Sequence, residues 1–166
     1  MPGQRWTRQA ARRGLATATR LGRRPRRLTI EALEDRRLLA VLNVGPGQRY
    51  ATIQAAVDAA RPGDMVLLAD SQYTESVDLS RMGVARGGST GDLLIRGGSS
   101  EETIVKPSGT AAFFNSAPFI GDLSIEQLTV SGVSAGTGVS GVKLQQWTGD
   151  VTVTDAIFDG LSDAGI

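Results

Sequence analysis

Four aspartates lie close together near the C-terminal end of the chain, and they are the side chains best suited to chemistry. Ca²⁺ in proteins is held by several oxygen ligands that meet at one point. The candidate metal ligands are therefore Asp155, Asp159 and Asp163, with Asp150 just before them. Asp155 and Asp159 are four positions apart, which is compatible with a shared strand face near a turn. Aspartates in turns more often bond to nearby backbone, and we favour this structural interpretation. No catalytic residue is assigned, and no cofactor is predicted beyond this Ca²⁺ candidate.

Two further groups of side chains could contact a sugar. Arg96, Lys106 and Lys143 are suited to acidic sugars, although charged residues of this kind more often form a solvated face. Residues 145–147 (Gln-Gln-Trp) form a polar and aromatic segment. A tryptophan can stack on a sugar ring, but we favour hydrophobic packing of Trp147 at a corner of the fold.

The composition excludes several kinds of site. The chain contains no histidine and no cysteine. This excludes the Ser-His-Asp and Cys-His catalytic arrangements, histidine-ligated metals and disulfide bonds. A protein without disulfides can still be rigid if a repetitive ladder of backbone hydrogen bonds holds it together.

The charge is distributed unevenly. Residues 1–40 carry 11 arginines against three acidic residues, whereas the remaining residues carry 7 basic and 14 acidic side chains. We predict that residues 1–42 form a disordered, arginine-rich targeting arm on an acidic body. The alternatives for this arm are a solvated tail without a role and a nucleic-acid tail. We do not favour the nucleic-acid tail, because aromatic residues are not interleaved with the arginines, and the partner prediction includes no nucleic acid.

A repeat organises the body of the chain, residues 43–166. Gly-Asp occurs at 63–64, 91–92, 121–122 and 149–150, at spacings of 28, 30 and 28 residues, and an apolar run follows each pair. Three short strands and three turns account for one such period. The pattern therefore predicts an all-β parallel β-helix solenoid with an N-terminal cap and about four coils. A β-sandwich also has short strands and glycine-rich turns, but it does not predict a fixed register.

Two of the repeats can be aligned residue by residue. The alignment pairs Leu123 with Val151, Ile125 with Val153, Leu128 with Ala156, Val130 with Phe158, and Gly132 with Gly160. In a solenoid, equivalent positions of neighbouring coils stack, so we expect these pairs to be in contact. Leu123, Ile125, Leu128 and Val130 should face the interior, and Phe113, Phe114 and Phe119 should fill the second coil or a corner.

A short helix is expected at residues 52–60. Ile53, Ala56, Val57 and Ala60 form one apolar stripe, Thr52 is suited to the N-cap, and Pro62-Gly63 ends the helix. A helix this short needs a surface to cover. We expect it to cover the open end of the first coil, followed by strands at residues 65–69 and 73–79.

The segment from Tyr50 to Leu79 resembles the opening of right-handed parallel β-helix proteins. The shared pattern is Tyr-x-Thr-Ile-Gln-x-Ala-Val-x-x-Ala, then Gly-Asp, a strand and Tyr-x-Glu-x-Val. The group includes pectate lyases and pectin methylesterases. The resemblance implies a right-handed coil, with Tyr73 and Glu75 in packing and turn formation. In lyases of this fold, carboxylates on one strand face bind Ca²⁺ and a Lys or Arg acts as base. The segment 154–160 is similar to an esterase stretch, but Ala156 replaces an aromatic residue.

A second resemblance lies in the arm. Leu33, Glu34, Arg36, Leu38 and Leu39 match a Leu-Glu-Pro-Arg…Leu-Leu motif found near the start of large bacterial surface proteins, with Asp35 in place of proline. It implies export, and hence an extracellular or cell-surface location. No apolar run is long enough for a membrane span.

These observations predict a secreted or cell-surface β-helix protein with a binding or structural role toward polysaccharide. The alternative is the N-terminal fragment of a carbohydrate-active enzyme, either a polysaccharide lyase or a protein like pectin methylesterase. The last coil has no polar closing segment, so we also expect the protein to continue into further coils.

Overall fold

The computed structural model describes residues 39–88, 90–132 and 138–162, and every structural statement below concerns these residues. Residues 1–38 of the predicted arm lie outside them, so its disorder stays a prediction. The first strand starts at Val41, two residues before the predicted start of the body.

The fold is built almost entirely from parallel β-strands in four sheets. Sheet A contains, in spatial order, β1 (Val41–Val44), β2 (Met65–Leu68), β5 (Leu93–Gly97), β9 (Leu123–Glu126) and β13 (Val151–Thr154). Sheet B contains β14 (Ile157–Asp159), β10 (Thr129–Ser131), β6 (Ile104–Lys106) and β3 (Gln72–Thr74). Sheet C contains β11 (Ser140–Lys143), β7 (Ala111–Phe114) and β4 (Val77–Asp78), and sheet D contains β12 (Trp147–Thr148) and β8 (Phe119–Ile120).

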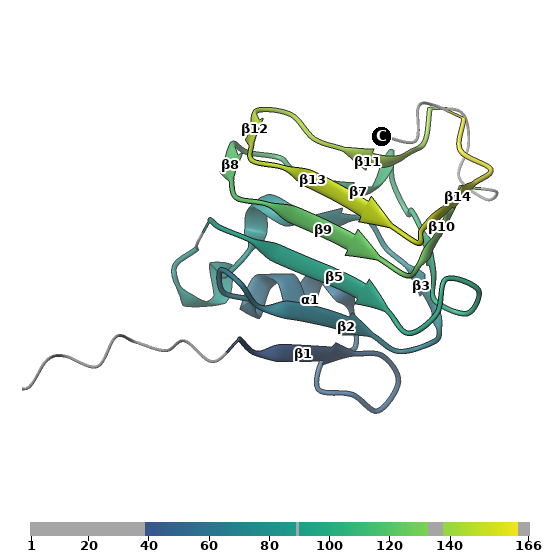
Figure 1. Cartoon of the computed structure of the whole chain (residues 1–166), viewed down its shortest axis with the longest axis horizontal. Coiled ribbons are helices and arrows are strands. Elements are labelled where there is room, and N and C mark those ends of the chain that lie inside the picture. Colours follow the sequence, from purple (N-terminus) through teal and green to yellow (C-terminus); the bar gives the residue numbers. More distant parts are fainter. Residues whose placement is uncertain (1–38, 89, 133–137, 163–166) are drawn as a thin grey trace, which may run out of the picture. The chain divides into compact units, whose positions relative to one another are not determined.

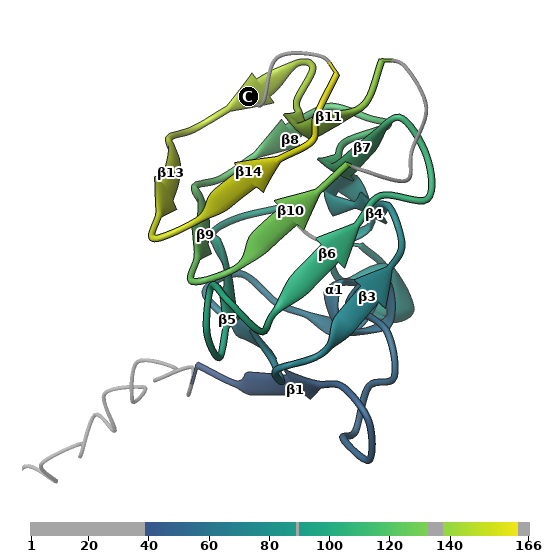
Figure 2. The ribbon, with the colours of Figure 1, turned by 90° about the vertical axis from the view of Figure 1, so that its right-hand side faces the viewer.

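The chain visits these sheets in turn, one coil at a time. Coil 1 is β2, β3 and β4; coil 2 runs from β5 to β8; coil 3 runs from β9 to β12; and coil 4 begins with β13 and β14. Figure 1 shows the strands of sheet A side by side, and Figure 2 shows those of sheet B. Each strand pairs in parallel with its equivalent in the next coil. The predicted parallel β-helix solenoid is therefore confirmed.

The interior is a stack of apolar side chains at equivalent positions. Leu123 and Ile125 are fully buried, and the register places them beside Val151 and Val153. Val130 likewise lies beside Phe158, which packs against the core. The stacking predicted from the aligned repeats is confirmed for these three pairs. Phe113 and Phe119 are buried as expected, whereas Phe114 is only half-buried.

Helix α1 (Ile53–Ala59) closes the N-terminal end of the coils, packing against β1, β2 and β4. The side chains of Ile53, Ala56 and Val57 are completely buried, as the predicted stripe requires. Burial of Ile53 and Val57 contributes about 1.5–3 kcal/mol each. The hydroxyl of Thr52 accepts a hydrogen bond from the Ala55 N–H at 3.2 Å, so Thr52 is the N-cap. The amphipathic pattern therefore identified both the helix and the surface it covers.

Glu75 also fixes the start of α1. Its carboxylate accepts hydrogen bonds from the N–H groups of Ile53 and Gln54, at 2.8 and 3.0 Å. These donors have no partner within a helix, and a negative charge at this end is favourable. The predicted single strand at 73–79 is wrong, because the chain turns at Glu75 between β3 and β4 and then enters the 3₁₀ turn η1 (Leu79–Arg81). The turn aims the Glu75 side chain at the helix.

The Gly-Asp repeat marks one corner of every coil. Gly91, Gly121 and Gly149 have φ of +143°, +148° and +138°, values that side chains rarely allow. A Cβ on Gly121 would lie 2.3 Å from the carbonyl carbon and oxygen of Gly91. The next residues form a ladder: Asp122 N–H donates to Asp92 Oδ1 at 3.0 Å, and Asp150 N–H donates to Asp122 Oδ1 at 2.9 Å. The repeat therefore encodes close coil stacking.

Between coils 1 and 2 the register differs from the Gly-Asp alignment. Met65 pairs with Leu94 and Val66 pairs with Ile95, one residue later than the repeat predicts. A further 3₁₀ turn, η2 (Val84–Arg86), lies in the connection between these coils. The shift places Val66 and Ile95 together in the interior.

Candidate functional site

The turns that lead from sheet A to sheet B differ in length, and their corner forms the candidate site. In coil 2 this turn comprises residues 98–103, whereas in coils 3 and 4 it comprises only 127–128 and 155–156. The loop 98–103, which we call the lip, therefore projects beside the short turns of the following coils (Figure 1). Serine, glycine and glutamate dominate its sequence.

Hydrogen bonds hold the lip in place. Thr103 is buried, and its hydroxyl donates to Asp70 Oδ1 at 2.9 Å while accepting from the Gly98 N–H at 3.1 Å. The Thr103 N–H donates to the Ser99 carbonyl at 2.9 Å. The Thr129 hydroxyl donates to the Ser100 carbonyl, which ties the lip to coil 3. A loop fixed by this many contacts presents a preformed surface.

Two cavities lie along this corner and share Gly98 as a lining residue. The larger has a volume of about 530 Å³ and is lined by residues of coils 2 to 4: Gly98, Ser99, Ser100, Gln127, Asp155, Ala156 and Ile157. The smaller has a volume of about 350 Å³ and is lined by Asn43, Val44, Gln48, Leu67, Leu68, Ala69, Asp70 and Gly98. We refer to the two together as the corner groove. Its polar lining consists of hydroxyl, amide and carboxylate groups, which suit a hydroxyl-rich ligand.

Backbone geometry sets the floor of the larger cavity. Gln127 and Asp155 occupy equivalent turn positions, with φ of +53° and +51°. The Gln127 N–H donates to the Thr154 carbonyl at 3.1 Å, which joins coils 3 and 4. The Gln127 side chain accepts a hydrogen bond from Arg96 Nε at 2.7 Å. The two equivalent turns thus place an amide and a carboxylate one above the other.

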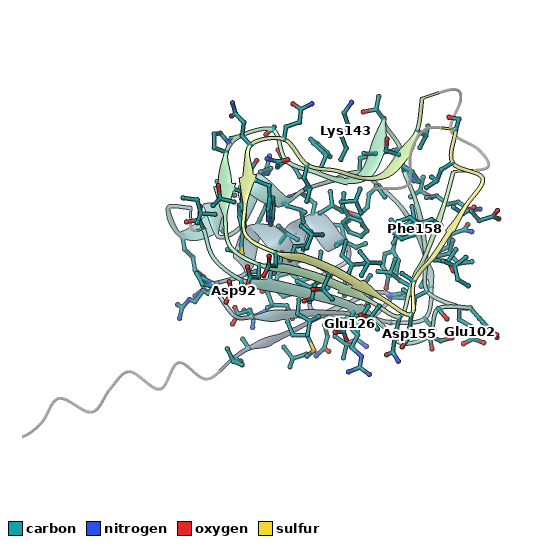
Figure 3. The ribbon with its side chains drawn as sticks, turned by 45° about the horizontal axis from the view of Figure 1, so that its top comes forward. Asp92, Glu102, Glu126, Lys143, Asp155 and Phe158 are labelled. Carbon is teal, nitrogen blue, oxygen red and sulfur yellow. The ribbon has the colours of Figure 1, made fainter. Side chains whose placement is uncertain are left out.

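The charged side chains that line the corner groove are carboxylates. Its charged lining residues are Asp70 and Asp155, and neither cavity is lined by Lys or Arg. Figure 3 shows Asp155, Glu126 and Glu102 on the same side of the molecule, with Lys143 on the opposite side. Glu101 and Glu102 of the lip are exposed. Carboxylates at these positions disfavour anionic ligands, and the Arg96 guanidinium lies behind Gln127, to which it donates.

The predicted metal ligands are only partly described. Asp155 lies in the turn before β14, Asp159 ends that strand, and both are exposed. Asp163 lies outside the described residues. Within the described part of the chain, no group of three or more carboxylate, thiol or imidazole side chains is arranged to hold a metal ion. The Ca²⁺ site stays a prediction. Asp155 adopts a left-handed backbone conformation in this turn, with φ of +51°.

The predicted sugar-reading cations do not converge on one surface. Arg96 lies in β5 of sheet A, Lys106 in β6 of sheet B, and Lys143 in β11 of sheet C. Arg96 is bonded to Gln127, as described above. The three residues therefore cannot read one acidic sugar chain together, and the interpretation of separate solvated positions fits better.

Trp147 packs against the edge of the core, as predicted. Its ring stacks on that of Phe119, with centroids 4.4 Å apart and an angle of 21° between the planes. The indole Nε1 is buried, and among the described residues it has no hydrogen-bond partner. Gln145 and Gln146 precede it in the turn before β12. Trp147 is therefore a half-buried side chain that packs against the core through Phe119, which is the corner packing that the sequence favoured.

Three titratable groups of the first coil have shifted pKa values, and one of them is the exposed Arg81, whose pKa is raised by its hydrogen bond to Asp58. Burial would raise the pKa of Asp78, but hydrogen bonds from Ser116 and Ser80 outweigh it, so the pKa of Asp78 lies below its ordinary value. Burial raises the pKa of Tyr73, and a hydrogen bond to the Ala69 carbonyl only partly opposes it. The Tyr73 hydroxyl lies 3.1 Å from the Val44 carbonyl and 2.8 Å from the Ala69 carbonyl. Tyr73 therefore supports one wall of the smaller cavity.

No family model, curated protein or solved structure matches the chain. The resemblance to pectin lyase-like proteins and the surface-protein motif in the arm therefore stay predictions from the sequence. Within the described residues, no helix combines the length and apolar character of a membrane-spanning segment.

Sequence reasoning missed the corner groove. The signal available was Gly98-Ser99-Ser100, a small and polar segment directly after the strand that ends at Gly97. The nearly constant repeat length conceals this longer loop. Coil 2 has more residues than coil 3 between sheets A and B, and it has fewer between sheets B and C. Four residues (107–110) separate β6 from β7, whereas eight residues of the sequence separate β10 from β11.

Proposed function

We propose that this protein binds polysaccharide at the bacterial cell surface or outside the cell, through the corner groove. The observation that carries the proposal is the pair of polar cavities that meet at Gly98. A groove formed by successive coils extends along the solenoid, and an extended groove fits a polymer better than a single sugar. The location rests on the motif in the arm.

The chemistry of the lining supports recognition. Ser99, Ser100 and Gln127 offer hydroxyl and amide groups that can exchange hydrogen bonds with sugar hydroxyls. Ile157, whose side chain is 48% exposed, provides an apolar surface for the C–H face of a sugar ring. The lip is held by hydrogen bonds, so binding costs little loop ordering.

Binding fits this groove better than hydrolysis or elimination does. Glycosidases place two carboxyl groups about 5–10 Å apart. Asp70 and Asp155 follow strands β2 and β13, which are separated by three strand spacings in sheet A, or roughly 14 Å. A lyase would need a basic side chain beside the sugar, and the groove lining contains no Lys or Arg.

Retention of the full chain in gels that contain a polysaccharide tests the proposal. The panel is cellulose derivatives, mannan, chitosan, alginate and polygalacturonate. The test variant is Ser100→Leu, which removes a hydroxyl from the larger cavity and places a bulkier apolar side chain in its lining. The matched control is Ser108→Leu, because Ser108 is an exposed serine of the same coil that lines neither cavity.

We expect at least one polysaccharide to retard the native chain, and Ser100→Leu to weaken this at least tenfold. Ser108→Leu should behave like the native chain. Failure of every polysaccharide to retard the protein, or equal weakening by both substitutions, would refute the proposal.

A further inference from the structure

We propose that the corner groove selects polysaccharides by charge, taking chains of amino sugars in preference to neutral chains and rejecting chains of uronic acids. This inference rests on the proposed function, since it concerns what the same groove binds. It differs from the expectation drawn from Arg96, Lys106 and Lys143, which pointed to acidic sugars.

The first argument is the sign of the charge that a ligand would meet. Asp70 contributes a carboxylate to the smaller cavity and Asp155 contributes one to the larger. Arg96 does not line either cavity, and its Nε donates to the Gln127 amide behind the lining. An anionic sugar in the groove would therefore meet the Asp70 and Asp155 carboxylates directly, whereas the Arg96 guanidinium would reach it only across Gln127.

The second argument is that the Asp155 carboxylate is free to contact a ligand. Its side chain is exposed, and among the described residues it forms no ion pair and accepts no hydrogen bond. It lies directly before Ala156 and Ile157, so a carboxylate stands next to an apolar surface in the same cavity. A sugar that carries an ammonium group beside an apolar ring face matches both features. Charge-assisted hydrogen bonds between ammonium and carboxylate are stronger than neutral ones.

The third argument concerns Asp70. Its Oδ1 accepts a hydrogen bond from the Thr103 hydroxyl, which fixes the carboxylate at the base of the lip. A Cβ placed on Gly98 would lie 2.4 Å from this oxygen, so the lack of a side chain at residue 98 keeps Asp70 in place between the two cavities. A ligand that crosses Gly98 therefore passes directly beside a fixed negative charge.

Isothermal titration of the full chain with three hexasaccharides tests this inference. The ligands are hexamers of glucosamine, N-acetylglucosamine and galacturonic acid, at a pH where the glucosamine amine is protonated. The test variant is Asp155→Asn. Asparagine tolerates the left-handed conformation found here, at φ +51°, so the substitution removes the charge and keeps the turn. The matched control is Asp150→Asn, an exposed aspartate before the same strand that lines neither cavity.

We expect the glucosamine hexamer to bind about fivefold more tightly than the N-acetylated hexamer at low salt, and the galacturonate hexamer not to bind. Asp155→Asn should abolish most of this preference, and Asp150→Asn should leave it unchanged. Binding of galacturonate as tight as that of the N-acetylated hexamer would overturn the charge selection while leaving the proposed function in place. Absence of binding by all three hexamers would overturn the charge selection, and the proposed function would fall only if every polysaccharide of the gel panel also failed to retard the chain.

Discussion

The side-chain amide of Gln54 pairs with the backbone of Asp78 as another strand would. Its Nε2 donates to the Asp78 carbonyl at 3.2 Å, and its Oε1 accepts from the Asp78 N–H at 2.7 Å. Asp78 ends β4, the first strand of sheet C. A single glutamine on the capping helix therefore provides hydrogen-bond partners for the N–H and the carbonyl of Asp78, at the open edge of sheet C.

Replacing this amide should destabilise the N-terminal end. In Gln54→Ala both backbone groups of Asp78 lose their partner, which should cost about 1–3 kcal/mol. Thermal unfolding followed by circular dichroism measures the loss. Gln72→Ala is the control, because Gln72 is exposed and should shift stability by less than about 0.5 kcal/mol. Equal effects of the two substitutions would show that the Gln54 pairing contributes nothing.

The Gly-Asp corner provides a second prediction. Gly121→Ala should destabilise by about 3 kcal/mol or more, because it adds a contact with the Gly91 backbone to the unfavourable backbone conformation. Gly87→Ala separates the two effects, since Gly87 has φ +99° and nothing lies within 4 Å of the position that a Cβ would take there. It should cost only about 1–2 kcal/mol. Denaturant titration compares them, and similar losses would contradict close stacking at this corner.

Acid should weaken the fold through Asp78. Its pKa in the folded state lies below the ordinary value of 3.8 because Ser116 and Ser80 donate hydrogen bonds to the carboxylate. A folded-state pKa that is lower than the unfolded one gives stability above the unfolded pKa, and this stability is lost as the pH falls through the folded pKa. The melting temperature of Asp78→Asn should therefore approach that of the native chain as the pH falls from about 5 to about 2. A constant difference over that range would exclude this role.

Substitutions of Trp147 separate the contribution of ring packing to stability from that of its indole N–H. Trp147→Phe keeps a ring against Phe119 and removes a buried N–H that has no partner among the described residues, so it should change stability by less than about 1 kcal/mol. Trp147→Ala removes the stack and should cost about 2–3 kcal/mol. Thermal unfolding distinguishes the two. A large loss in Trp147→Phe would indicate that the N–H has an acceptor.

The fold could be predicted from the sequence wherever apolar and polar residues alternate along a strand. In residues 123–130, polar positions separate the apolar ones, so Leu123 and Ile125 could be assigned to the interior and the register to Val151 and Val153 followed. Residues 65–68 are a continuous apolar run, and no alternation fixes which of them faces inward. The one-residue shift between Met65 and Leu94 could not be predicted for this reason.

The corner groove could not be predicted from the repeat. A spacing of 28 or 30 residues counts a whole coil and does not show how its residues divide among the turns. The lip depends on that division, and its shape depends on the contacts of Thr103 with Asp70 and Gly98, which lie in two different coils. Neither contact follows from a recognisable spacing in the sequence.

The position of α1 in the chain has a consequence for biosynthesis. The helix and β1 leave the ribosome before any of the strands they cover, so every later coil meets a finished edge on which to form. We expect the nascent chain to assemble from its N-terminal end, each coil templating the next, with no need to wait for distant segments. A helix placed at the other end would have left the growing coils open to association between neighbouring nascent chains.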